Sequence, residues 1–368
     1  MQVSKCLLVL CPLFLPAAAL ADVPAGYTIT VLGGVGTTAS ALNQAGQVAG
    51  VIPDPVSGAL RAYIWHNGTR SLLDTPINQV AGISNDGKVA GAIVGSDADG
   101  LLSSAAYYAN GTTTVLPALP GTAPRVSYLS GINSAGTVVG TQLNDTRPYG
   151  FTYGGGVLTA LGGLGMGSWS YGSAISENGI IIASGETGEG YFHAAEFIGT
   201  TLADFGTLDA TGSGYALDVN EHGTMVGYSE IMYDPMFDKA WVMQNHVMQP
   251  FGNFPTYTDS RALGLNNLGQ IVGESEGAFL YSDGVVYDLN TLAAHDASFT
   301  LTSARDINDR GDIIATACGT DGGCYGVLLS PVPEPAPAAM LLAGLGLAGG
   351  LRYRLRRKKT CLSQKACL

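Results

Sequence analysis

The stretch Leu265–Gly273, LNNLGQIVG, decides the fold because it is one copy of a unit that recurs along the chain. The unit has Asn or Ser three residues before a glycine, with apolar residues on both sides. Consecutive copies lie 41 to 49 residues apart, which is typical of a repeat architecture whose units bury their apolar faces against each other. The seven copies are centred on Gly46, Gly87, Gly136, Gly179, Gly223, Gly269 and Gly311.

Asn-x-x-Gly between two apolar runs predicts a hairpin turn. The Asn side chain bonds the backbone further along the turn, and Gly accepts the left-handed conformation at its end. The apolar pair that follows, such as Ile271-Val272, predicts a strand covered on both faces. A second glycine then predicts a place where backbones crowd, and Ala183 and Ala315 replace it in two copies. It is Gly50, Gly91, Gly140, Gly227 and Gly273 in the others.

An aromatic strand follows in most copies, as at Ala278–Tyr281, then a short turn and another apolar strand. Each repeat therefore has about four strands, the content of one propeller blade. The last copy lacks its closing strand after Tyr325–Leu329, while Tyr27–Leu32 matches that strand. We predict an all-β fold over 22–330: a seven-bladed β-propeller closed by pairing of the N-terminal strand with the last blade.

The two-part repeat resembles the extracellular HAF repeat of secreted bacterial proteins, whose name describes the motif at Ala278-Phe279 and its relatives. The resemblance covers nearly all of 27–330. It implies this architecture and an extracellular location, and it implies no chemistry for any residue.

Charge is distributed unevenly. Residues 22–330 contain nine basic and 28 acidic residues, a net charge of −19. A domain this acidic repels phosphate backbones, so we expect no nucleic-acid partner.

The N-terminus, Met1–Ala21, has one positive charge, an apolar run and Ala19-x-Ala21 before Asp22. This pattern predicts a secretory signal peptide that is cleaved after Ala21. The mature chain is therefore expected outside the cytoplasm.

The C-terminus has three parts. A motif of Val332, Pro333, Glu334 and Pro335 precedes an apolar run, Ala336–Leu351, of near-spanning length. The basic cluster that follows would stay cytoplasmic, so the segment predicts a transmembrane helix that anchors an external domain. The cluster consists of Arg352, Arg354, Arg356, Arg357, Lys358 and Lys359, and a tail of residues 360–368 follows.

The order of these parts over 331–359 resembles the PEP-CTERM sorting signal of Gram-negative bacteria. The resemblance implies an inner-membrane-anchored precursor, processing by an exosortase near Pro333–Pro335, and delivery to the cell surface. It also implies association with exopolysaccharide, as in a biofilm matrix. The alternative is a permanent tail anchor.

Cys318 and Cys324 are the two cysteines within the repeat region, with Gly-Thr-Asp-Gly-Gly between them. An exported chain favours a disulfide that cross-links a hairpin. A metal site is the other interpretation, but no second Cys or His pair accompanies them.

No cofactor or metal motif is present. The five histidines lack metal-ligand spacing. Asp218-x-Asn220 and Asp306-x-Asn308 imitate the start of a calcium loop, but the later carboxylate is absent. A paired-carboxylate glycosidase stays open as an alternative, because its two acids meet only in space.

Two longer inserts, Gly165–Tyr171 and Ser229–Asp238, combine aromatic and polar residues. Loops on a rigid scaffold often bind ligands, and exposed aromatic rings can stack on sugars. The plainer interpretation is that these rings pack over blade edges. We predict a non-enzymatic structural or binding protein, with a polysaccharide-cleaving enzyme at the channel mouth as the alternative. The candidate ligand residues are Trp169, Tyr171, Tyr233, Asp234, Phe237 and Asp238.

Overall fold

The computed structural model describes residues 26–332, apart from 99, 145–146, 166–168, 234, 256–257 and 294–297. These residues form 28 strands and one short helix, α1 (Leu289–Leu292). The strands make five four-stranded sheets and one eight-stranded sheet. The all-β prediction is confirmed.

The strands follow the chain in sets of four antiparallel neighbours. The first four sets are β2–β5 (Ala41–Leu42, Val48–Pro53, Leu60–His66, Thr69–Leu72), β6–β9 (Gln79–Ile83, Val89–Asp97, Gly100–Ala109, Thr112–Val115), β10–β13 (Val126–Ile132, Val138–Asn144, Arg147–Gly154, Val157–Ala160) and β14–β17 (Ser170–Ile175, Ile181–Glu186, Phe192–Ile198, Thr201–Gly206). The others are β18–β21 (Gly214–Val219, Met225–Ile231, Phe237–Gln244, Val247–Pro250), β22–β25 (Arg261–Leu265, Ile271–Glu274, Ala278–Ser282, Val285–Asp288) and β26–β28 (Phe299–Ile307, Ile313–Gly319, Cys324–Pro331) with β1 (Tyr27–Val31).

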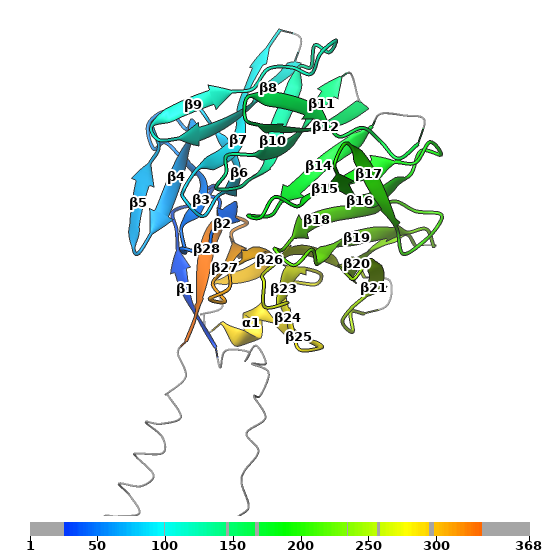
Figure 1. Cartoon of the computed structure of the whole chain (residues 1–368). Coiled ribbons are helices and arrows are strands. Elements are labelled where there is room, and N and C mark those ends of the chain that lie inside the picture. Colours follow the sequence, from blue (N-terminus) through cyan, green and yellow to red (C-terminus); the bar gives the residue numbers. More distant parts are fainter. Residues whose placement is uncertain are drawn as a thin grey trace, which may run out of the picture.

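The sets lie around a common centre in chain order, with their first strands innermost (Figure 1). The first strand of each set contacts the first strand of the next, and β26 contacts β2, so the contacts run in a full circle. No described sheet closes on itself. The circle is therefore made by side-chain packing and individual hydrogen bonds between sheets.

One link between sets was not predicted. β8 pairs in parallel with β10 through Ser103 and Val126, which joins two sets into the eight-stranded sheet. The Ser127 hydroxyl accepts a hydrogen bond from the Ala105 N–H at 2.9 Å, and the Ser103 hydroxyl donates to the Ser127 carbonyl. These bonds hold the third strand of one set beside the first strand of the next.

The first strand of the domain completes the last set, as predicted. β1 pairs antiparallel with β28, from Tyr27 opposite Pro331 to Val31 opposite Val327. Tyr27 is 2 % exposed and belongs to the core cluster of the last set. The Val332 N–H donates to the Gly26 carbonyl at 2.9 Å, so the two ends of the described chain lie together.

The repeated hairpin forms as its residues predict. Asn266 accepts hydrogen bonds from the N–H groups of Leu268 and Gln270 on its side-chain oxygen. Gly269 has a φ of 81°, and the equivalent glycine is left-handed in all seven copies. The strand that follows is covered on both faces, because Val89 and Ala90 are both 0 % exposed and pack in different core clusters.

The second glycine of each repeat faces a close backbone. A Cβ at Gly227 would lie 1.9 Å from the Tyr215 carbonyl oxygen and 2.8 Å from the Trp241 ring. Four of the five glycines pair across the sheet with a large aromatic ring, whereas Ala183 pairs with a small residue. Gly91, opposite Ala106, is the exception. The aromatic pairs are Gly50–Tyr63, Gly140–Phe151, Gly227–Trp241 and Gly273–Phe279.

The predicted signal peptide, residues 1–21, and the predicted anchor helix, 336–351, lie outside the described residues. In the part of the chain that the structure describes, no helix has the length and apolar character that a membrane span requires.

Candidate functional site

The seven hairpin turns meet at one end of the circle, and turn asparagines tie several of them to the next turn. Asn220 shapes its own turn through its side-chain oxygen, which accepts from the Thr224 N–H. Its side-chain nitrogen donates to the carbonyl of Asn266, the equivalent residue in the next set, at 3.1 Å. The same bond links Asn266 to Asn308 at 3.0 Å, and Asn308 to Asn43 at 3.2 Å. Because Asn43 belongs to the first set and Asn308 to the last, this last bond joins the ends of the repeat.

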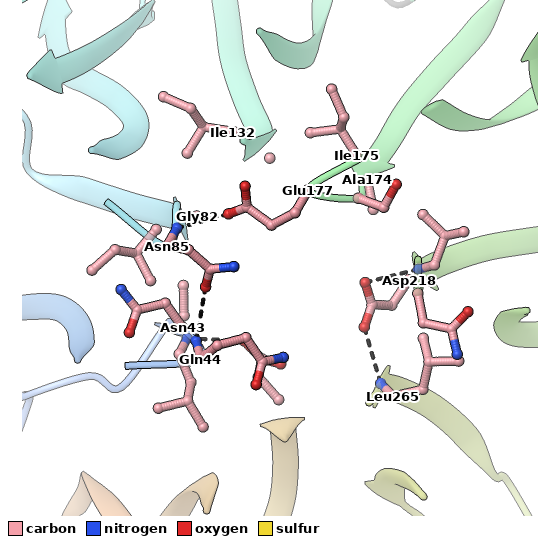
Figure 2. A pocket seen from close by; sticks show the side chains of 18 of the residues that line it. Asn43, Gln44, Gly82, Asn85, Ile132, Ala174, Ile175, Glu177, Asp218 and Leu265 are labelled. Carbon is pink, nitrogen blue, oxygen red and sulfur yellow. Dashed lines mark hydrogen bonds between the residues drawn. The ribbon is translucent and has the colours of Figure 1, made fainter. Parts of the chain in front are cut away.

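A second series of bonds uses the residue after the turn asparagine. The Asp309 N–H donates to the Gln44 side chain at 2.8 Å, and the Gln44 N–H donates to the Asn85 side chain at 2.9 Å. Glu177 points across the mouth and accepts from the N–H groups of Asn85 and Ser134, at 2.7 and 2.9 Å (Figure 2). The single Glu177 side chain therefore binds the backbone of two other sets.

Two acidic residues line the same mouth, Asp218 and Asp306, each two positions before its turn asparagine. Asp218 accepts from the Leu265 N–H of the next set at 3.0 Å and from the Val219 N–H at 2.8 Å (Figure 2). Asp306 accepts from the Leu42 N–H of the first set at 2.9 Å. The other sets have Gly or Ala at this position. Both carboxyl groups therefore join neighbouring sets, a role different from the calcium loop that their spacing imitates.

Burial raises the pKa of the Asp218 carboxyl group. Burial, and then the negative charge of Asp218, raises the pKa of Asp306. A free Asp titrates near pH ~4, so the folded state binds more protons than the unfolded state between that pH and the raised pKa values. This contribution to stability is present at low pH and is lost as pH rises through the folded pKa values.

Because of this pair, we expect the free energy of unfolding to fall as the pH rises from about 5 to about 8. In Asp218→Asn, the pKa of Asp306 should fall, because one of its two causes is removed, and the pH dependence should become shallower. Carboxyl-carbon NMR titration of Asp306 measures the first effect and denaturant unfolding at each pH the second. An unchanged Asp306 titration in Asp218→Asn would show that the two carboxyls do not interact.

The cavity at this mouth is about 180 Å³. Pockets for drug-sized ligands are about 300–1,000 Å³, so this one is too small for a sugar chain. Since each carboxylate already accepts backbone hydrogen bonds, the mouth is built to hold the sets together.

Of the predicted ligand residues, Tyr171 lies near the start of the inner strand β14 and begins a row of aromatic rings. Tyr171 packs on Phe192, with ring centroids 5.2 Å apart, and Phe192 lies 6.0 Å from Tyr215. Tyr215 lies 5.1 Å from Tyr228. All four residues are half-buried, so each presents part of a ring to solvent.

The row continues into a charged pair. The Arg261 guanidinium lies over the Tyr228 ring at 4.9 Å, and its Nε donates to Asp238 at 2.7 Å. The tyrosine row is defined here as Tyr171, Phe192, Tyr215, Tyr228 and Arg261. It crosses three consecutive sets.

The remaining candidates are separate from the row. The Arg147 guanidinium lies over the Trp169 ring at 4.5 Å. Phe237 pairs with Ile231 on the neighbouring strand, and Tyr233 is 69 % exposed. Asp234 lies outside the described residues. The two predicted inserts thus contribute Tyr171 and Asp238 to one surface, while Trp169 contacts Arg147.

Sequence inspection missed Tyr215, although a signal was present. With the seven copies aligned on the turn Asn or Ser, the residue five positions earlier is Tyr in three consecutive copies and Arg in the next. This position varies while the turns repeat, which indicates a surface with a separate role. In chain order it is Thr38, Gln79, Tyr128, Tyr171, Tyr215, Arg261 and Ser303.

Cys318 and Cys324 lie opposite each other on β27 and β28 and form a disulfide in the structure. Within the described ranges, no group of three or more His, Cys, Asp or Glu side chains could hold a metal ion. Val332 of the predicted sorting motif directly follows β28 and is 40 % exposed. Pro333, Glu334, Pro335 and the basic cluster 352–359 lie outside the described residues.

The all-β fold is similar to solved β-propellers. The β-propeller domain of the Trilobed protease from Pyrococcus furiosus, described as having an open velcro topology, matches with a TM-score of 0.54 and 10% identity. That match covers 82% of this chain and 97% of the other. A prolyl endopeptidase matches with a TM-score of 0.51 and 10% identity, over 84% of this chain and 48% of that one. At these identities the likeness extends to the fold alone.

The family model of the PEP-CTERM protein-sorting motif matches residues 331–358. This confirms the sorting signal predicted from Pro333-Glu334-Pro335 and the segments after it. The chain is therefore an exported protein that is sorted to the cell surface. No curated protein matches the sequence, and the resemblance to the HAF repeat stays a prediction.

Proposed function

We propose that this chain is a seven-bladed β-propeller that acts at the cell surface as a non-enzymatic binding or structural component of an exopolysaccharide matrix. The match to the sorting motif is the observation that carries the proposal. The exosortase-type processing enzyme is its expected partner during export, with a transient membrane attachment through residues 336–351.

The geometry of the circle supports the blade count and the closure. Each of the seven sets has four strands once β1 is counted with β26–β28. The bonds from Asn308 to Asn43 and from Leu42 to Asp306 join the last set to the first. A scaffold closed in this way is rigid, so its loops and strand ends can present a fixed binding surface.

One observation favours an enzyme as the second candidate. Asp218 and Asp306 are two acids with raised pKa values at a channel mouth, and a glycosidase needs one protonated and one ionised acid. Their backbone hydrogen bonds and the small cavity support the structural role instead.

Incubation with the polysaccharide of the producing cells tests both functions. We expect the full-length protein to co-sediment with the polymer and to leave its size distribution unchanged. Shortening of the polymer that is lost in Asp218→Asn would establish the enzyme. Absence of co-sedimentation, with no shortening, would refute both.

Sorting predicts a processed C-terminus. We expect the mature surface protein to end near Pro333–Pro335, because the apolar segment and basic cluster are removed when the signal is processed. Mass spectrometry of the C-terminal peptide from surface protein measures this. Retention of residues 341–359 would indicate a permanent tail anchor instead.

A further inference from the structure

A second cavity, of about 340 Å³, lies further from the hairpin turns along the inner strands. Its polar lining comes from four sets, in their first strands or just before them: Ser40, Gln79, Tyr128, Ser130 and Arg305. Gln79 and Tyr128 occupy the variable position five residues before the turn Asn or Ser. This cavity adjoins the cavity at the turn mouth, because Ala81 and Ser130 line both.

Arg305 is the distinctive group in this cavity. Its side chain is exposed, and its guanidinium makes no hydrogen bond or ion pair with the described part of the chain. The other copies have Ser, Ala or Leu at this position, three before the turn Asn or Ser. A planar guanidinium has five donors, so Arg305 is available to bind several oxygen atoms of one ligand.

Tyr128 connects the cavity with the tyrosine row. Tyr128 lies opposite Thr141 on the neighbouring strand, and the Thr141 hydroxyl accepts a hydrogen bond from the Gly172 N–H, next to Tyr171. Tyr171 begins the row that continues through Phe192 to Tyr215. The cavity and the row therefore form one surface of half-buried aromatic rings, phenol hydroxyls and one free guanidinium.

The chemistry of this surface suits a sugar polymer. A sugar ring has an apolar face that can stack on tyrosine and hydroxyl oxygens that can accept from Arg305 and Gln79. The cavity volume lies within the range of about 300–1,000 Å³ that is usual for ligand pockets. The net charge of −19 over residues 22–330 repels a polyanion, so the surface favours an uncharged polymer.

We propose that Arg305, Gln79 and Tyr128 bind one sugar unit of a neutral polysaccharide, and that the tyrosine row holds the units that follow. The inference rests on the proposed function, and it adds the site and the class of polymer. It places the binding surface next to the turn mouth, on the side away from the hairpin turns.

Affinity electrophoresis and calorimetry of the full-length protein with dextran, cellohexaose and laminarihexaose test the site, with polygalacturonate as the charged comparison. We expect at least one neutral glucan to bind and Arg305→Ala to weaken that binding at least tenfold, with an unchanged melting temperature. Tyr171→Phe, which removes only a hydroxyl, should weaken it by a smaller factor. Arg61→Ala removes an exposed arginine that does not line the cavity and should bind as the unaltered protein does.

The outcomes separate the site from the proposed function. Neutral glucan binding that is equal in Arg305→Ala and the unaltered protein would overturn the site and leave the function standing. Stronger binding of polygalacturonate would overturn the neutral class. If neither these glucans nor the polysaccharide of the producing cells binds, both the inference and the proposed function fall.

Discussion

Deletion of residues 26–31 should unfold the domain or leave it too unstable to purify as a monomer. β1 provides the fourth strand of the last set, and Tyr27 fills the core around Leu289 and Leu301. Removal of one buried aromatic side chain alone costs about 3–5 kcal/mol, and a typical domain is stable by only about 5–15 kcal/mol. The deletion also exposes the edge of β28, which can pair with other chains. Denaturant unfolding followed by circular dichroism, with size-exclusion chromatography, measures both effects.

The matched control begins at Asp22, without the predicted signal peptide, and should keep full stability. Tyr27→Ala is a milder variant that should fold with a loss of about 3–5 kcal/mol. Addition of a peptide of residues 26–32 to the deleted chain should restore part of the lost stability. Equal unfolding midpoints for the deletion and the control would show that β1 does not close the circle.

Gly227→Ala should lower the free energy of unfolding by about 1–3 kcal/mol, the usual cost of overpacking a core. The new Cβ would meet the Tyr215 carbonyl oxygen at 1.9 Å, and strand pairing holds that oxygen in place. The Trp241 ring closes the other side at 2.8 Å and is itself fully buried. Neither neighbour can move without disturbing the paired strands. Denaturant unfolding measures the loss.

Gly95→Ala is the control. Gly95 also lies in a second strand, β7, but a Cβ there would have no atom within 4 Å. We expect its stability to stay within about 0.5 kcal/mol of the unaltered protein. Equal losses for the two variants would mean that crowding at Gly227 is not the cause.

Much of the fold could be predicted because its signals are local. Asn266 and Gly269 form their turn from bonds within five residues, so the seven hairpins could be predicted from the sequence alone. The pairing of β1 with β28 was also predictable, since the last copy lacks one strand and the first segment supplies it. The β8–β10 link was not, because a single Ser103–Val126 pair has no pattern of its own.

The candidate surfaces were less predictable. Asp306 matches the start of a calcium loop in sequence, yet its carboxylate binds the backbone of Leu42 in the first set. Tyr171 was predicted from its insert, whereas Tyr215 and Arg305 belong to regular strands that resemble the other copies. A search for unusual loops does not find residues that differ only within the repeat.

The sequence by itself determined the turns, the strand content and the C-terminal sorting signal. Each depends on the chemistry of neighbouring residues or on composition. Only the tertiary structure decided which polar groups share a cavity: Asp218 with Asp306 at the turn mouth, and Tyr128 with Arg305 in the cavity beside it. The reason is that the circle brings the first strands of distant sets to a common centre, and no local pattern specifies which side chains face each other across it.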